Sequence, residues 1–173
     1  MNAKVKEIMS WIASLFLYLG IALMIRYFIF NITAVDGMSM YPTLDNGDKL
    51  ITQRISLYLR EPEVGEIVVF KNPLGKEHFI KRVIAREGDQ VELKDGQVLV
   101  NGEAREENFI NGNETLPNYP DQTSWQVGEG EIFVMGDNRG ASNDSRSFGP
   151  IKLKSLVGIS EIRVYPFSKI GKL

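Results

Sequence analysis

The runs GEIVVF at residues 65–70 and HFIKRVIA at residues 78–85 decide the fold of this chain. Both are rich in β-branched and aromatic residues, and Asn72-Pro73 between them marks a turn, so we expect two β-strands. Other runs that we interpret in the same way lie at residues 90–92, 97–100, 131–135 and 157–164. Asp95-Gly96 between two of these runs predicts a hairpin turn. The sequence therefore predicts a mainly β domain, with antiparallel strands in a barrel-like or sandwich arrangement.

The composition excludes several classes of protein. With 173 residues, 43% of them hydrophobic, and a net charge of −2, the chain is long enough for a folded core and is neither disordered nor a basic nucleic-acid binder. It has no cysteines, which excludes disulfides, thiolate metal sites and cysteine nucleophiles. The single histidine, His78, excludes a histidine-rich metal site. We therefore expect no metal and no nucleic-acid partner.

The amino-terminal region is typical of a membrane anchor. Residues 11–30, WIASLFLYLGIALMIRYFIF, carry one charge, Arg26. About 20 apolar residues span the hydrocarbon core of a bilayer, and a long basic side chain near the end of the span can reach the headgroups. A cleaved signal peptide is the alternative, but its apolar run is usually about 7–15 residues long, and Ile32-Thr33-Ala34 offers no convincing cleavage site. We therefore expect one transmembrane helix that is retained.

The chain divides at residue 32 in this interpretation. Residues 1–32 form a cytoplasmic tip and the anchor, and residues 33–173 form an extracytoplasmic β-rich domain with a loop-rich insertion at about 101–128. Lysines precede the span at positions 4 and 6, whereas aspartates follow it at positions 36, 45 and 48. Because basic residues favour the cytoplasmic side, we expect a single-pass plasma-membrane protein with a cytoplasmic amino terminus.

Ser39 is the candidate nucleophile, and it lies only nine residues after the apolar run. A serine hydroxyl becomes a nucleophile when a neighbouring base takes its proton. Two bases are candidates: His78 with an orienting acid, or Lys81 kept neutral by burial. Strand alternation places Lys81 on the same face as Phe79, where burial would lower the pKa of the amine. The residues alone leave open both a catalytic lysine and a lysine that snorkels from a half-buried strand.

Four blocks of sequence, in this order, carry a resemblance to a known family. They are GMSMYPTL at residues 37–44 followed by Gly47-Asp48, GEIVVF at 65–70, IKRVIA at 80–85, and GDNRGASNDSR at 136–146. Together with the amino-terminal anchor they resemble the type I signal peptidases, in the compact form of Gram-positive bacteria. These enzymes are membrane-anchored serine proteases with a Ser/Lys dyad, and they remove signal peptides from exported proteins. The likeness covers nearly the whole chain.

The resemblance implies roles for matching residues in what would be the catalytic domain. Ser39 is the expected nucleophile, Lys81 the expected general base, and Ser142 the serine that orients the lysine amine. A charged set is expected to support the site rather than to take part in the chemistry: Asp144, Arg146, Asp137 and Arg82. The oxyanion hole would use the backbone N–H of Ser39. Gly37 stands where Gram-negative relatives carry a hydroxyl, so the second donor stays open.

The substrate implied by the resemblance is an exported pre-protein with small residues near its cleavage point. An extended peptide would pair with strand edges. The expected walls are Ala34, Val35, Asp36, Gly37, His78, Phe79 and Ile80. The expected partners are signal peptides, the lipid bilayer and the secretion machinery, and no cofactor is required. Two alternatives stay open: a catalytically silent protein that binds signal peptides or a secretion partner, and another Ser–Lys peptidase of the self-cleaving kind, against which the membrane span argues.

Overall fold

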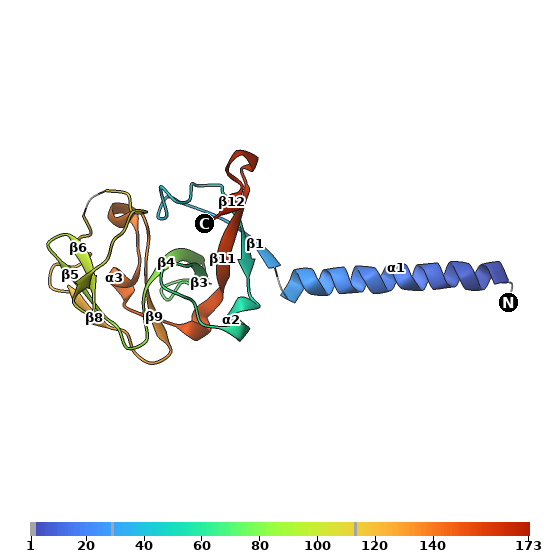
Figure 1. The fold of residues 1–173 in the computed structure, drawn as a ribbon, viewed down its shortest axis with the longest axis horizontal. Helices are drawn as coiled ribbons and strands as arrows, with labels where there is room; N and C mark the ends of the chain where they lie inside the picture. The colour runs from blue at the N-terminus through green and yellow to red at the C-terminus, as the bar shows by residue number, and fades with distance from the viewer. Residues whose placement is uncertain (1–2, 29, 113) are drawn as a thin grey trace.

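A computed structural model describes residues 3–28, 30–112 and 114–173. One long helix, α1 (Ala3–Phe28), extends away from a β domain that holds the rest of the described chain (Figure 1). At 1.5 Å per residue, its 26 residues span about 39 Å. The segment Lys4–Met24 is long and apolar enough to cross a membrane, and none of it is buried against the domain. The expected single amino-terminal apolar helix is therefore present.

The anchor leads almost directly into the β domain. Helix α1 ends at Phe28, and strand β1 (Phe30–Ala34) begins two residues later. β1 pairs with β2 (Lys49–Gln53) in antiparallel register along its whole length. The helix expected over residues 11–30 therefore ends at Phe28, before the apolar run does. Residue 32, which we expected to separate the anchor from the domain, lies inside β1. The backbone pairing with β2 explains this difference, because it holds Phe30, the last residue of the apolar run, in a strand.

The larger sheet contains eight strands in the order β1-β2-β11-β3-β4-β9-β10, with β12 paired to β11. All of its pairs are antiparallel. The strands not yet defined are β3 (Ile67–Lys71), β4 (His78–Arg86), β9 (Glu131–Met135), β10 (Ile151–Lys152), β11 (Leu156–Tyr165) and β12 (Gly171–Lys172). Short helices lie between them: α2 (Ser56–Leu59), α3 (Ser145–Phe148) and 3₁₀ turns at Arg139–Ala141, Leu153–Ser155 and Phe167–Lys169.

The smaller sheet lies at the end of the domain away from α1 (Figure 1). Its order is β7-β6-β5-β8, formed by Glu103–Ala104, Gln97–Val100, Gln90–Lys94 and Ser124–Gln126. The expected hairpin joins β5 to β6, and its two turn residues, Asp95 and Gly96, both have positive φ (52° and 75°), as a two-residue type I′ turn requires. The region 101–128, expected to be loop-rich, also supplies β7 and β8. The two antiparallel sheets confirm a mainly β domain.

Strand β4 is the centre of the domain because it is buried on both faces from Ile80 to Ala85. The simple alternation expected for this strand therefore underestimates its burial. One apolar cluster lies between β4, β9 and the smaller sheet, where Phe133 packs against Trp125 with ring centroids 5.1 Å apart. A second cluster lies beneath the loop that follows β1 and includes Met40. The site described below therefore rests on packed core on both sides.

Phe133 provides a test of this packing. The side chain is fully buried, so Phe133→Ala removes apolar contacts and leaves a cavity. We expect the free energy of unfolding to fall by about 3–5 kcal/mol. Leu74→Ala is the control, because Leu74 is exposed and its truncation should change the same quantity by less than about 0.5 kcal/mol. Urea unfolding in detergent, followed by tryptophan fluorescence, measures both variants. Equal stability of the two would contradict the described packing.

Candidate active site

A loop between β1 and β2 presents Ser39. The base of the loop is closed by a backbone hydrogen bond from Val35 N–H to Asp48 O (2.8 Å). Gly37 has a φ of 92°, a left-handed conformation that favours glycine. Its N–H donates to Asn46 Oδ1 (2.9 Å), so this amide is already engaged within the loop. The chain thus turns just before Ser39 and holds the serine next to β4.

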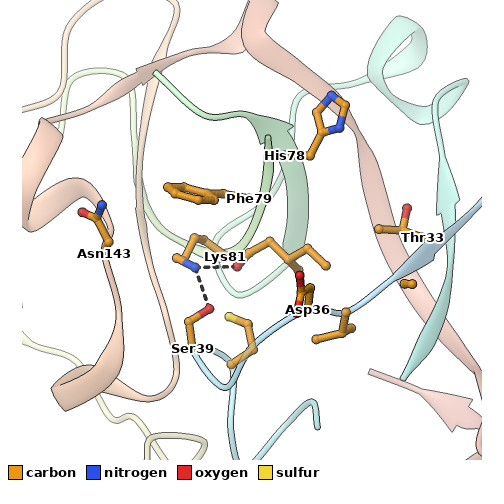
Figure 2. Close-up of a pocket in the computed structure, with 11 residues that line it drawn as sticks. Thr33, Asp36, Ser39, His78, Phe79, Lys81 and Asn143 are labelled. Carbon is orange, nitrogen blue, oxygen red and sulfur yellow. Dashed lines mark hydrogen bonds between the residues drawn. The ribbon is translucent and has the colours of Figure 1, made fainter. Parts of the chain in front are cut away.

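Lys81 reaches Ser39 from β4, as Figure 2 shows. Its Nζ lies 2.7 Å from Ser39 Oγ and donates to Ile80 O at 3.0 Å. Only 3% of Lys81 is exposed, and its Nζ lies 5.2 Å from the centroid of the Phe79 ring. Ser39 itself is half-buried. A hydroxyl that can be reached from solvent therefore lies within hydrogen-bonding distance of an enclosed amine.

The enclosure changes the acidity of Lys81. Desolvation lowers the pKa of the amine to about 8, while the negative charges of Asp144 and Asp137 act in the opposite direction. Desolvation disfavours the charged form because the protein interior solvates an ammonium ion poorly. With a pKa of about 8, about a quarter of the amine is neutral at pH 7.5, compared with about 0.1% for an ordinary lysine. A neutral amine is able to accept the proton of a serine hydroxyl.

Asp137 joins the strand of Lys81 to the loop of Ser39. Arg82, next to Lys81, forms a bidentate ion pair with Asp137, with distances of 2.9 Å from Nε to Oδ1 and 2.6 Å from Nη2 to Oδ2. Thr43, on the Ser39 loop, donates its hydroxyl to Asp137 Oδ2 (2.5 Å). Because Asp137 is fully buried, these donors replace the water that its carboxylate has lost. The carboxylate therefore fixes the two segments relative to each other.

A second buried ion pair shapes the loop of residues 136–146, which we call the 136–146 loop. Asp144 accepts from Arg146 Nε and Nη2 at 2.9 Å each, and it caps α3 by accepting from Arg146 N. Asp144 Oδ2 also accepts from Gly136 N–H (3.0 Å), at the other end of the loop. Arg146 donates to Arg139 O (2.7 Å) in the middle of the loop. The pair therefore closes the loop on itself.

Ser142 lies in this loop, close to Ser39. A Cβ built on Gly136 would collide with both Ser142 Oγ and Ser39 O, so both serines pack directly on that glycine. Ser142 Oγ is buried and has no hydrogen-bond partner in the part of the chain that the structure describes. The bond to the Lys81 amine implied by the family resemblance is not formed here. Its orienting role therefore stays a prediction.

A groove of about 310 Å³ runs past Ser39 and Lys81. Six of the seven residues expected to bind substrate line it: Ala34, Val35 and Asp36 from the β1 side, and His78, Phe79 and Ile80 from β4. Gly37, the seventh, is not among its lining residues. β1 ends the larger sheet, and β9 pairs with β4 only from Arg82 onward. Both walls of the groove therefore present strand edges that no other described strand covers.

Sequence reasoning missed several residues of the site. Thr33 and Asn143 also line the groove. Asn138 donates its N–H to Ser39 O (3.0 Å) and its side-chain amide to Met38 O (3.0 Å). The only signal for Asn138 was its place in the block at 136–146, because its partners lie about 100 residues earlier. Among the described residues, no three His, Cys, Asp or Glu side chains are grouped in a way that could hold a metal ion.

Comparisons with known proteins agree with this geometry. A family model described as signal peptidase, peptidase S26, matches residues 8–165. Signal peptidase I S of Bacillus subtilis (strain 168) is 35% identical over 178 residues, covering 98% of this chain and 96% of the relative. Thylakoidal processing peptidase 1 of Arabidopsis thaliana is 38% identical over 149 residues, covering 80% of this chain. The chain spans less than half of that relative's length (43%).

A solved structure is also similar. The signal peptidase I of Enterococcus faecalis V583 is 33% identical, and the match covers 58% of this chain and 97% of that one, with a TM-score of 0.49.

The acidity of Lys81 can be tested without an activity assay. We expect the Lys81 side-chain amine to titrate with a pKa of about 8, because desolvation outweighs the two nearby carboxylates. NMR of the full chain in detergent, with ¹³C-labelled lysine, follows the Cε resonance against pH, and Lys81→Met identifies the signal. The exposed Lys76 serves as the internal comparison, assigned in the same way with Lys76→Met. A Lys81 midpoint near 10.5 would contradict the described burial.

Proposed function

The chain belongs to the signal peptidase family, peptidase S26, and we propose that it is a membrane-anchored serine endopeptidase that cleaves signal peptides from exported pre-proteins. The observation that carries this proposal is the 2.7 Å separation between Ser39 Oγ and the buried amine of Lys81. A nucleophile, a base with a lowered pKa and a groove with open strand edges occur together at one place. These are the parts that acyl transfer to a serine requires.

In the first step, the neutral amine of Lys81 takes the proton of Ser39 Oγ as this oxygen attacks the scissile carbonyl. A tetrahedral intermediate forms, and the resulting ammonium then gives its proton to the leaving amine. The acyl group remains on Ser39 as an ester. Water, deprotonated by the same amine, attacks that ester; the ammonium then returns the proton to Ser39 Oγ as the signal peptide leaves with a free carboxylate. Lys81 thus serves as base and acid in turn, which a pKa near the working pH favours.

The developing oxyanion would be stabilised by the backbone N–H of Ser39. Gly37 is unsuited as a second donor, because it has no hydroxyl and its amide already donates to Asn46. Ser142 would orient the ammonium form of Lys81. Its buried hydroxyl lies beside Ser39 and has no partner among the described residues, so its oxygen can accept such a hydrogen bond.

The substrate would bind as an extended strand between β1 and β4. Backbone groups along Thr33–Asp36 and His78–Ile80 supply the pairing positions on the two sides of the groove. Met40 and Phe79 lie close to Ser39 and Lys81 and restrict the space there. A restricted apolar space favours small residues next to the scissile bond, as in the cleavage sites of signal peptides.

The membrane fixes where this reaction takes place. We propose that α1 spans the plasma membrane once, with its amino terminus in the cytoplasm and the β domain outside. The basic residues Lys4 and Lys6 precede the apolar stretch, and Asp36, Asp45 and Asp48 follow it. Because β1 begins two residues after the helix, the groove is held close to the bilayer, where the signal helix of a pre-protein ends. Contact with the secretion machinery would deliver the substrate there.

Two substitutions test the dyad. Ser39→Ala removes the nucleophile, and Lys81→Arg replaces the base by a guanidinium that stays protonated. We expect each variant to lose at least about 10³-fold in cleavage rate, as removal of a member of a catalytic unit does. The assay incubates purified full-length protein in detergent with a radiolabelled pre-protein.

In the wild type, kcat/KM should fall about tenfold per pH unit below a pKa of about 8, because only neutral Lys81 acts as base.

The outcomes separate the proposed enzyme from its alternatives. Activity that survives in Lys81→Arg would refute the general-base role. A wild-type chain that binds the pre-protein without cleaving it would favour a silent binding protein. Lys76→Arg is the matched control for Lys81→Arg, because Lys76 is exposed and does not line the groove. We expect its kcat to stay within about twofold of the wild type, the range of an exposed surface substitution.

The absence of cysteine makes the membrane orientation testable. Single cysteines are introduced as Lys4→Cys, before the span, and Thr123→Cys, on the exposed surface of the β domain. In intact cells without an outer membrane, a membrane-impermeant maleimide should label position 123 at once and position 4 only after permeabilisation. The reverse pattern would overturn the proposed orientation.

A further inference from the structure

The region expected to be a loop-rich insertion contacts the site directly. Residues 107–111, Glu107-Asn108-Phe109-Ile110-Asn111, run along the 136–146 loop, and we call this segment the strap. It contributes no residue to the groove lining. Its contacts are instead with three consecutive residues of the 136–146 loop and with one residue of β4.

The strongest of these contacts joins Glu107 to Arg139. The guanidinium donates Nη2 to Glu107 Oε1 (2.6 Å) and Nη1 to Glu107 Oε2 (2.7 Å). The side chain of Arg139 is 1% exposed and that of Glu107 is 7% exposed. Thr115 Oγ1 accepts a further bond from Arg139 (2.6 Å). Arg139 Nε donates to Gly136 O (3.0 Å), which places the guanidinium inside the 136–146 loop.

Two other strap residues reinforce this contact. Asn111 N–H donates to Asp137 O (2.8 Å), and the Asn111 side chain donates to Asn138 Oδ1 (3.3 Å). The ring of Phe109 lies under the guanidinium of Arg82, 4.2 Å from its carbon to the ring centroid. The strap therefore touches the same Arg82–Asp137 pair that fixes β4 to the Ser39 loop.

Each loop residue held by the strap acts in turn on the reacting groups. Asp137 binds Arg82, the neighbour of Lys81. Asn138 binds the carbonyl of Ser39. Arg139 binds Gly136 O, and Gly136 packs between Ser39 O and Ser142 Oγ. Displacement of the loop would therefore move the nucleophile, its base and the orienting serine together.

We propose that Glu107 is a positioning residue for the peptidase reaction: through Arg139 it holds the 136–146 loop at the distance from Ser39 and Lys81 that proton transfer requires. The inference rests on the proposed function, and it assigns to the strap the role of setting kcat. Removal of Glu107 leaves a buried guanidinium without its counter-ion, and such a group is strongly driven to regain water. The loop would move outward as it does so.

Glu107→Gln tests this role in the full chain in detergent with the same pre-protein. The amide keeps the size of the side chain but loses its charge and one acceptor. We expect kcat to fall about 10- to 100-fold, as displacement of reacting groups by about 1 Å does. KM should stay within about twofold, because the strap does not line the groove.

The pH profile adds a readout that a merely structural residue would not move. Desolvation is the largest influence on Lys81, and Asp144 and Asp137 are the charged groups that oppose it. Outward movement of the loop would admit water to the amine and raise its pKa. The acidic limb of kcat/KM should therefore shift to higher pH in Glu107→Gln. Glu107→Asp retains the charge and should recover part of kcat and of the limb position.

Glu106→Gln is the matched control, because Glu106 is the exposed neighbour of Glu107, and its side chain accepts a hydrogen bond from the exposed Asn108 but does not contact Arg139. It should leave both kcat and the limb unchanged. A folded Glu107→Gln with wild-type kcat and limb, a loss confined to KM, or an equal loss in Glu106→Gln would overturn the proposal. If Glu107→Gln does not fold, Thr115→Val, which removes only the third acceptor of Arg139, takes its place under the same criteria.

Ser39→Ala, assayed in parallel, separates this inference from the proposed function. Cleavage by the wild type and none by Ser39→Ala supports the peptidase, and the result for Glu107→Gln then decides the role of the strap alone. A wild-type chain that cleaves nothing overturns both.

Discussion

The buried carboxylate of Asp137 is the constraint on which the rest of the site depends. It binds Arg82 from β4 and Thr43 from the Ser39 loop, and its own backbone belongs to the 136–146 loop. Three segments far apart in the sequence therefore meet at one charge. Inside a protein, a carboxylate without such partners would be strongly destabilising, so the fold that satisfies Asp137 also brings Ser39 and Lys81 together.

The catalytic groups are few, whereas many residues hold them in place. Ser39 and Lys81 contribute one hydroxyl and one amine, whereas two buried ion pairs, the strap and two apolar clusters hold them in place. A lysine base needs this arrangement more than a histidine base does, because its ordinary pKa lies far above neutral pH. Here desolvation lowers that pKa, and β4 provides the enclosed environment because it is buried on both faces.

Strands with continuous β-branched runs could be predicted from the sequence, because β-branched residues favour the extended backbone. The Asp95-Gly96 hairpin could also be predicted, because this pair favours a two-residue turn. β1 could not, because FNITA is a five-residue segment directly after an apolar helix, and its strand conformation depends on pairing with β2, which begins 15 residues after β1 ends. The ion pair of Glu107 with Arg139 links residues 32 apart in a region of weak pattern, so nothing local indicates it. Ser39 and Lys81 were predicted from strand alternation and the family blocks. The burial of Arg82 was not, because it depends on the ion pair with Asp137, a residue 55 positions away in the sequence.

The enclosure of Lys81 has a consequence for the stability of the whole domain. Its amine has a pKa of about 8 in the folded protein and its ordinary value of 10.5 in the unfolded chain. Between these values the unfolded chain keeps a proton that the folded domain has released, so the free energy of unfolding rises with pH from about 8 to 10.5. Below pH 8 both states are protonated, and the enclosed charge makes the fold less stable, by about 3 kcal/mol, than an ordinary lysine would. The enclosed amine that activates Ser39 thus lowers the stability of the β domain.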